Sequence, residues 1–181
     1  MREPINIRTI VLRVSALSLL LLLILVATLT VRTLNRVPNT MLYFVSTGET
    51  DFRLQGVARN LPKSEAETHL KESLQALIDG PTASEAARGL STALTPSTEI
   101  LGLRLLGSEV EVDLPQAFTE GGGSATMQGR LNQVFYTLTQ PTTVTSVRLL
   151  IEGEPVSYLG GEGILVDNPW HRAEHDSLPS W

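Results

Sequence analysis

The sequence predicts an α+β fold for the part of the chain that follows one long apolar segment. Short apolar segments with strand periodicity come in pairs, and each pair is followed by one amphipathic helical pattern. Turns containing glycine or proline separate these elements. Two amphipathic helices bury their apolar stripes well when they pack on a sheet. We therefore predict the order ββαββαβ(β), a mixed sheet with two amphipathic helices packed on it, preceded by one transmembrane helix.

The apolar segment covers residues 14–31, carries no charge and is rich in leucine. Its 18 residues would span roughly 27 Å as a helix, close to the thickness of a bilayer's hydrocarbon core. Arginines flank it on both sides: Arg2, Arg8, Arg13, Arg32 and Arg36. The side with more positive charge usually stays in the cytoplasm. We predict a cytoplasmic segment 1–13, a single-pass transmembrane helix 14–31, and a linker 32–39 to an extracytoplasmic domain.

A cleavable signal peptide is the alternative interpretation of this segment. Such a peptide has a shorter apolar core and two small residues just before the cleavage site. Here residues 26–32 read Val-Ala-Thr-Leu-Thr-Val-Arg, without such a pair. The pattern therefore favours an uncleaved anchor.

Charge and cysteine content exclude several classes of protein. The first 36 residues hold five of the 14 basic and one of the 19 acidic side chains, so the remainder has a net charge of −9. Nucleic acids and anionic lipid surfaces both require basic patches, so neither is an expected partner of this part. The chain has no cysteine, which excludes disulfides, thiolate metal sites and a lipid-modified cysteine.

The first ββα unit is the clearest local signal. Residues 40–46 are apolar at nearly every position, which is typical of a covered strand, and a weaker strand follows at 52–59. Ser64 and Glu67 have the spacing of a capping box. The helix after them ends before the Gly80-Pro81 pair. Its apolar positions recur at helical spacing: Ala66, Leu70, Leu74, Leu77 and Ile78.

The second unit repeats this order without repeating the residues. After a small, polar stretch with one short helical turn at 84–88, the segments 101–105 and 110–114 alternate apolar and polar residues around Gly107-Ser108, which predicts a hairpin. Ser124 is a candidate cap of a second helix that ends before Pro141. Its apolar stripe comprises Met127, Leu131, Val134, Phe135 and Leu138. A strand at 144–151 follows, a short strand at 156–159 pairs back on it, and residues 167–181 form a flexible tail.

Six segments, taken in order, resemble the GerMN domain family of sporulation and germination proteins. They are Leu42–Ser46, Leu77–Pro81, Gly89–Pro96, Val110–Leu114, Gln133–Gln140 and Val147–Gly153. The resemblance covers about residues 40–166 as one copy. It implies an extracytoplasmic, membrane-anchored domain of the bacterial cell envelope that is not an enzyme, and a fold similar to ring-building modules that associate with copies or partners. It implies location and interaction for this chain, but not a part in sporulation itself.

One motif has the letters of a zinc site. Residues 171–175 read H-x-x-E-H, in which His171 and His175 would bind zinc and Glu174 would act as general base. That chemistry needs a packed helix and a further ligand downstream, whereas Pro169 precedes the motif and six residues follow it. A zinc hydrolase is therefore only a remote alternative. We predict no catalytic, cofactor or metal residues.

Two further features have plain structural explanations beside a functional one. Glu109, Glu111 and Asp113 alternate with apolar residues, so their carboxylates share one face of a strand. They form a possible partner-facing acidic strip, although an ordinary solvent-facing strand is the favoured explanation. The Gly121-Gly122-Gly123 run lacks the lysine of a phosphate-binding loop, which favours a connector.

The sequence therefore predicts a non-catalytic role in binding or assembly at the cell envelope, by self-association or with an envelope protein. The alternative is a module that binds peptidoglycan or another wall glycan. Sugars stack on exposed aromatic rings, and aromatic residues make up only 5% of this chain. The candidates are Tyr43, Tyr136, Tyr158, Trp170 and Trp181.

Overall fold

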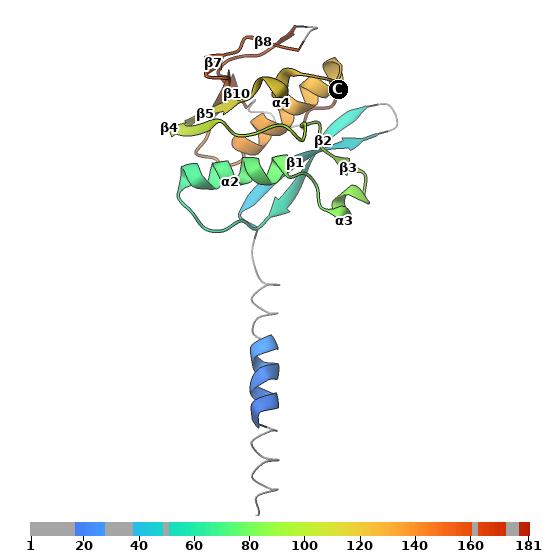
Figure 1. Cartoon of the computed structure of the whole chain (residues 1–181), viewed down its shortest axis with the longest axis vertical. Helices are drawn as coiled ribbons and strands as arrows, with labels where there is room; N and C mark the ends of the chain where they lie inside the picture. Colours follow the sequence, from blue (N-terminus) through green and yellow to red (C-terminus); the bar gives the residue numbers. More distant parts are fainter. Residues whose placement is uncertain (1–16, 28–37, 49–50, 161–162, 173–177) are drawn as a thin grey trace, which may run out of the picture. The chain divides into compact units, whose positions relative to one another are not determined.

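A computed structural model describes residues 17–27, 38–48, 51–160, 163–172 and 178–181. Residues 38–181 form one compact unit, and the helix at 17–27 belongs to a separate one (Figure 1). The ends of the expected transmembrane helix, 14–16 and 28–31, lie outside the described residues. Within the described part of the chain, no helix has the length and apolar character needed to cross a bilayer.

The first sheet of the compact unit has the strand order β2-β1-β3 and is antiparallel. It comprises β1 (Thr40–Thr47), β2 (Phe52–Arg59) and β3 (Leu90–Ser91). β1 and β2 pair along their whole length, from Thr40 opposite Arg59 to Thr47 opposite Phe52. The two predicted strands are confirmed, whereas β3 is too short to give a period in the sequence.

The second sheet contains the predicted hairpin. Its order is β10-β6-β5-β4, with β7 paired to β6. The strands are β4 (Gly102–Leu106), β5 (Glu109–Leu114), β6 (Ser146–Ile151), β7 (Glu154–Pro155) and β10 (Trp170–His171). β5 and β6 are parallel and the other pairs are antiparallel, so the sheet is mixed as predicted. Gly107, with φ of +68°, forms the tight turn between β4 and β5.

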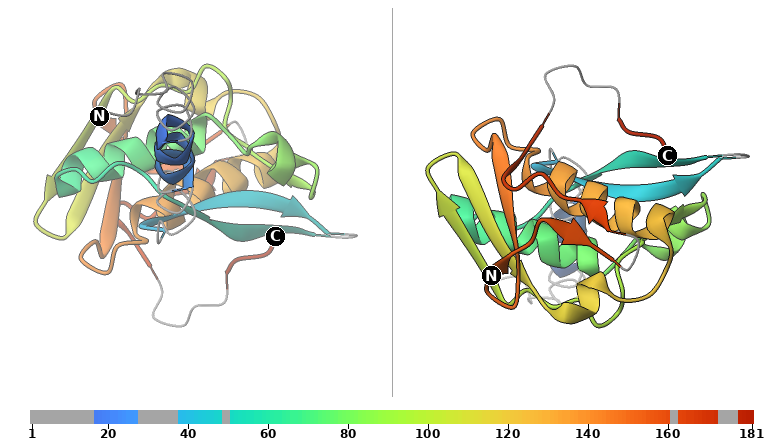
Figure 2. Two further views of the ribbon diagram at one scale, coloured as in Figure 1. Left: turned by 90° about the horizontal axis from the view of Figure 1, so that it is seen from below. Right: turned by 90° about the horizontal axis from the view of Figure 1, so that it is seen from above.

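The prediction of one sheet is wrong, because α4 (Ser124–Leu138) covers an edge that further strands would need. The Thr137 hydroxyl accepts a hydrogen bond from the backbone N–H of Tyr43, and the Gln133 amide donates one to the Tyr43 carbonyl. β3 pairs with Val45 and Ser46, farther along β1. α4 and α2 (Ala66–Ile78) lie side by side, with the β1–β2 hairpin on one side and β4–β6 on the other (Figures 1 and 2).

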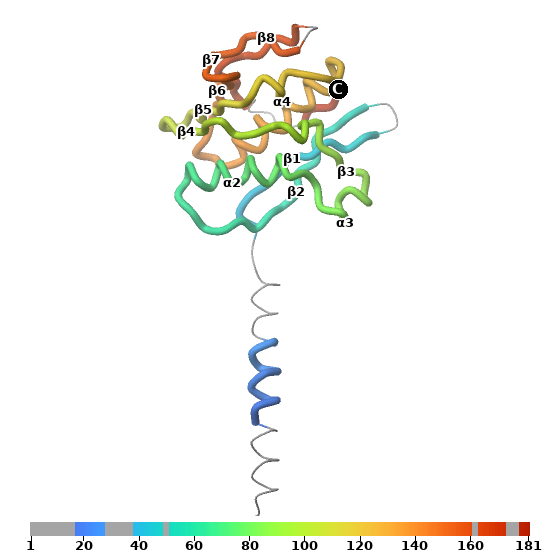
Figure 3. The backbone as a smooth tube through the Cα atoms, in the orientation of Figure 1, coloured from blue at the N-terminus to red at the C-terminus, as the bar shows by residue number. Residues whose placement is uncertain are grey.

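Helix α2 has the predicted extent but not the predicted cap. Its N-cap is Glu65, which makes no side-chain cap bond. The Ser64 hydroxyl donates to Glu72, and the Glu67 carboxylate accepts the backbone N–H of Leu105 on β4 at 2.8 Å. Tertiary partners have thus replaced the local capping box. The chain continues through α3 (Ala83–Ala86) and the 3₁₀ helix η1 (Gln116–Thr119) (Figure 3).

Helix α4 is buried on every side along much of its length. The predicted apolar stripe is buried, and so are Arg130, Gln133 and Thr137. The helix begins at Ser124 after the N-cap Gly123, so the predicted serine cap is wrong. An amphipathic pattern is expected of a helix with one exposed face. α4 instead packs against the unit on every side along its buried part, and backbone groups pair with the side chains of Arg130, Gln133 and Thr137.

The expected tail at 167–181 is wrong for its described residues. β10 pairs with β6, and the Trp170 ring stacks on Phe135 with centroids 5.0 Å apart. Residues 178–181 run along β2 (Figure 2). The strand expected at 156–159 does not pair back on β6 either: β7 does so, while β8 (Tyr158–Leu159) pairs with β9 (Ile164–Leu165).

Candidate functional site

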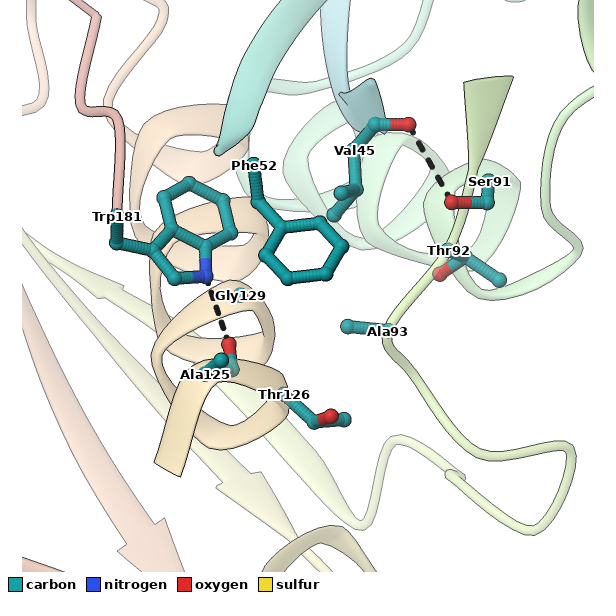
Figure 4. Close-up of a pocket in the computed structure, with 9 residues that line it drawn as sticks. All are labelled: Val45, Phe52, Ser91, Thr92, Ala93, Ala125, Thr126, Gly129 and Trp181. Carbon is teal, nitrogen blue, oxygen red and sulfur yellow. Dashed lines mark hydrogen bonds between the residues drawn. The ribbon is translucent and has the colours of Figure 1, made fainter. Parts of the chain in front are cut away.

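A pocket of about 170 Å³ lies between the first sheet, the start of α4 and residue Trp181 (Figure 4). We call it the Trp181 pocket. It is smaller than the clefts that hold drug-sized ligands, and its size suits a single side chain or ring. The described residues that line it are Val45, Phe52, Ser91, Thr92, Ala93, Ala125, Thr126, Gly129 and Trp181.

Small residues on α4 make room for the pocket. Ala125 and Gly129 are four residues apart and therefore lie on the same face of the helix. A Cβ atom at Gly129 would lie 3.2 Å from both the Ala93 Cβ and the Trp181 Cζ2, which is tighter than an ordinary contact. Glycine is thus the residue that lets the two walls approach the helix.

Buried polar side chains of α4 hold the opposite wall in place. The Gln133 side-chain oxygen accepts the backbone N–H of Ala93 at 2.7 Å, and the Arg130 Nε donates to the Ala93 carbonyl at 2.8 Å. The Ser91 hydroxyl donates to the carbonyl of Val45 at 3.4 Å. Both backbone groups of Ala93 are therefore bound from the helix, so this wall has a defined position without any ligand.

Phe52 and Trp181 form the aromatic wall. Their ring centroids lie 6.3 Å apart with the planes inclined by 29°. The backbone N–H of each residue donates to the carbonyl of the other at 3.0 Å, and the indole N–H of Trp181 donates to the Ala125 carbonyl at 2.7 Å. Hydrogen bonds thereby hold both the backbone and the indole ring of Trp181 in place.

The chemistry of the Trp181 pocket is that of binding an apolar group. None of its nine lining residues has an ionisable side chain, so the pocket contains no acid, base or charged ligand for a metal. The indole N–H is already bonded, and the Thr92 hydroxyl donates to Gln133 and accepts from Leu94. An apolar side chain can therefore enter without leaving these groups unpaired.

A second, more polar pocket of about 520 Å³ lies beside η1, and we call it the Tyr158 pocket. Tyr158 is 65% exposed, and its partner across the β8–β9 pair, Leu165, is equally exposed. Described residues that line this pocket are Gln116, Thr119, Glu120, Ile151, Glu154, Pro155, Val156, Tyr158 and Gly160. Amide, hydroxyl and carboxylate groups therefore surround one exposed aromatic ring.

The candidate acidic strip is mostly neutralised. Glu109, Glu111 and Asp113 share one face of β5, as the alternation predicts, but β5 lies inside the sheet and not at its edge. Arg148 Nε donates to Glu109 at 2.8 Å and Arg104 Nε donates to Glu111 at 3.1 Å. These hydrogen bonds raise the pKa of both arginines. The Asp113 carboxylate accepts the backbone N–H of Gly153.

Among the described residues of the H-x-x-E-H motif, the structure shows no helix of the kind that a zinc site of this type needs. His171 lies in β10 opposite Ser146, where a two-histidine helical site would need a helix. Glu174 and His175 lie outside the described residues. In the described ranges of the chain, no group of three or more His, Cys, Asp or Glu residues could hold a metal ion.

Three of the predicted aromatic candidates pack together instead of forming a platform. Tyr43 and Tyr136 meet edge to face at 5.7 Å, and Trp170 is tilted against Tyr136 at 5.4 Å. The Arg172 guanidinium covers the Tyr136 and Tyr43 rings at 4.7 and 5.6 Å. Trp181 and Tyr158 instead line the two pockets described above.

Sequence reasoning missed the Trp181 pocket itself. Phe52 and Gly129 have no spacing that links them to Trp181, because these residues meet only through the tertiary structure. The one available signal was the pair of small residues at Ala125 and Gly129 in a helix whose other inward positions are larger.

Comparison with known proteins identifies a family to which this chain is similar. Residues 41–157 match the model of the family Germane, described as sporulation and spore germination. This match confirms the resemblance of the six sequence segments. No curated protein matches the chain.

Three solved structures share the fold. The tandem GerMN domains of the sporulation protein GerM from Bacillus subtilis are 21% identical, with a TM-score of 0.59, over 74% of this chain and 45% of theirs. The first GerMN domain of that protein is 22% identical, with a TM-score of 0.58, over 74% of this chain and 96% of its own. A predicted lipoprotein from Clostridium perfringens is 20% identical, with a TM-score of 0.52, over 75% and 93%. The chain thus spans under half of the tandem structure.

Proposed function

This chain belongs to the Germane family of sporulation and spore germination proteins, and from that premise we propose that it is a membrane-anchored, extracytoplasmic binding module. Its role is non-catalytic, in assembly at the bacterial cell envelope. The single copy of the domain and the apolar segment at 14–31 support this proposal. So does the likeness in fold to a predicted lipoprotein.

The observation that carries the binding role is the chemistry of the Trp181 pocket. Its wall at 91–93 is bound from α4, its lining is uncharged, and the polar groups named above are already bonded. Such a pocket receives an apolar side chain of a protein, and its lining has no acid or base that could transfer a proton or activate the hydroxyls of Ser91, Thr92 and Thr126 as nucleophiles. Anchoring at a membrane would raise the effective concentration of partners held in the same plane.

Photo-crosslinking in intact cells tests this function. A photoreactive amino acid replaces Thr126 at the pocket in the full-length chain, and Lys71, exposed on the outer side of α2, is the matched control. We expect discrete protein adducts from position 126 and only background from position 71. Equal adduct patterns at both positions would contradict a binding role for this pocket.

Wall-glycan binding is the second candidate, and the Tyr158 pocket favours it. An exposed aromatic ring bordered by Gln116, Glu120 and Glu154 offers a stacking surface together with hydrogen-bonding groups, the combination that sugars need. Retention on purified sacculi is the test. Tyr158→Ala should release the protein, whereas Leu165→Ala, which removes an equally exposed side chain outside the pocket lining, should not. If both variants bind like the original chain, the glycan function fails.

A further inference from the structure

Residues 178–181 bind the rest of the unit as a peptide ligand would. They add an antiparallel strand to the edge of β2: Phe52 and Trp181 exchange two backbone hydrogen bonds at 3.0 Å, and Leu54 N–H donates to the Pro179 carbonyl at 3.3 Å. Arg53 and Ser180 form the bridge between these bonds. This is β-strand addition, in which main-chain bonds supply affinity and a pocket for a side chain supplies specificity.

Trp181 is the side chain that this mode of binding requires. Its ring stacks on Phe52, its indole N–H donates to Ala125, and it lies against Gly129. All three contact residues belong to β2 or α4, so the segment and its receptor are separate parts of one unit. The receptor surface therefore comprises the β2 edge from Phe52 to Leu54 together with the aromatic side of the Trp181 pocket.

We propose that this receptor surface binds residues 178–181 of a second copy of the chain, so that neighbouring copies are joined by exchanged segments. The exchange keeps every contact named above, because receptor and segment are identical in each copy; the added cost is that of bringing two copies together. The inference rests on the proposed function, since a shared membrane is what keeps that cost low. In the assembly, residues 178–181 of the neighbouring copy pair with the β2 edge, just as residues 178–181 of the same chain do in the structure.

Cysteine crosslinking distinguishes exchange between copies from binding within one copy. The chain has no cysteine of its own. Arg53 and Ser180 are both exposed, and they face each other between hydrogen-bonded pairs, where side chains of antiparallel strands come closest. Two full-length chains with different tags, one carrying Arg53→Cys and the other Ser180→Cys, are expressed together in membranes and oxidised.

We expect a disulfide-linked dimer containing both tags. The matched control pairs Ser180→Cys with Arg104→Cys, an exposed arginine in the other sheet, and should give only collisional background. Adding Trp181→Ala to the Ser180→Cys chain should lower the yield of the mixed dimer several-fold, which a chance collision would not show.

The proposal is overturned if the mixed dimer does not exceed the Arg104→Cys control while a single chain carrying both Arg53→Cys and Ser180→Cys closes its disulfide internally. In that case adducts at position 126 would still support the proposed binding function with a different partner. Loss of those adducts as well would remove the function itself.

Discussion

At the scale of single residues, Arg130 joins several parts of the unit. It is 3% exposed, and its guanidinium donates to the carbonyls of Ala93, Phe118, Glu120 and Gly121 at 2.6–3.1 Å. Burial lowers its pKa, and no salt bridge to it is found among the described residues. Backbone carbonyl dipoles thus stabilise the positive charge of Arg130. The same hydrogen bonds hold the glycine-rich connector and one wall of the Trp181 pocket in place.

Replacing Arg130 by methionine should destabilise residues 38–181 by about 3 kcal/mol, because four backbone carbonyls lose their donor and two of them belong to residues that are not exposed. Arg130→Lys should lie in between, since one ammonium group cannot reach all four. Urea unfolding measures both. Arg88→Met, at an exposed arginine, is the control and should change little. A loss below about 0.5 kcal/mol for Arg130→Met would show that these bonds do not hold the connector.

The Arg59–Glu85 pair predicts how stability depends on pH. The hydrogen bond from Arg59 lowers the pKa of Glu85 from 4.5 to about 2. Because the folded-state pKa lies below the unfolded value, the contribution is complete above pH 4.5 and is lost as pH falls towards 2. Arg59 is about one fifth exposed, so we expect only about 1–2 kcal/mol. Unfolding of Glu85→Gln should lack this part of the acid dependence; an unchanged pH profile would refute the assignment.

At the scale of elements, the contact between α4 and β1, which we call the seam, separates the β2-β1-β3 sheet from the β10-β6-β5-β4 sheet. The backbone of Tyr43 is bonded to Thr137 and Gln133, so a helix occupies an edge where a strand would otherwise pair. The same glutamine holds Ala93, which links the seam to the Trp181 pocket. The Gln133 side chain therefore connects α4 to both β1 and the wall of the Trp181 pocket.

Gln133→Met should cost about 2–3 kcal/mol of unfolding free energy, because the Tyr43 carbonyl and the Ala93 N–H would be left without partners. Gln128→Met is a control in the same helix: Gln128 is half-buried, and its side-chain amide donates to Asn132 one turn away. Chemical unfolding and amide hydrogen exchange at Ala93 measure the effect. The seam is not needed if exchange at Ala93 is as slow in Gln133→Met as in the unaltered chain.

At the scale of the whole molecule, the folded unit and the helix at 17–27 belong to separate units. The described core draws on both sheets, α2 and α4 and is contained in residues 38–181. The leucines of 17–27 are exposed, each by half or more. Exposed apolar residues on all sides of a helix are typical of a segment that contacts lipid.

The proposed anchor predicts that the full-length chain stays in the membrane pellet after alkaline washing, with residues 1–31 still attached by mass spectrometry. Leu21→Arg together with Leu25→Arg should release it, since each charge costs about 2.5–3.5 kcal/mol at the centre of a bilayer. Leu21→Ile with Leu25→Ile is the matched control and should stay bound. A mature chain that begins after residue 31 would instead support the signal peptide.

The sequence by itself determined the elements with strong local patterns. The extents of α2, β2 and the β4–β5 hairpin follow from helical spacing, alternation and turn chemistry, all of which act between near neighbours. The family followed from six such segments in order. The face shared by Glu109, Glu111 and Asp113 also followed, because strand geometry alone sets it.

Only the tertiary structure decided which of these elements meet. Glu67 caps β4 and not its own helix, α4 is buried all round, and Trp181 returns to Phe52 from 129 residues away. Local periodicity contains no information about such contacts, because the partner of a polar or aromatic side chain is set by packing between distant segments. The sheet boundary and the Trp181 pocket both arise in this way.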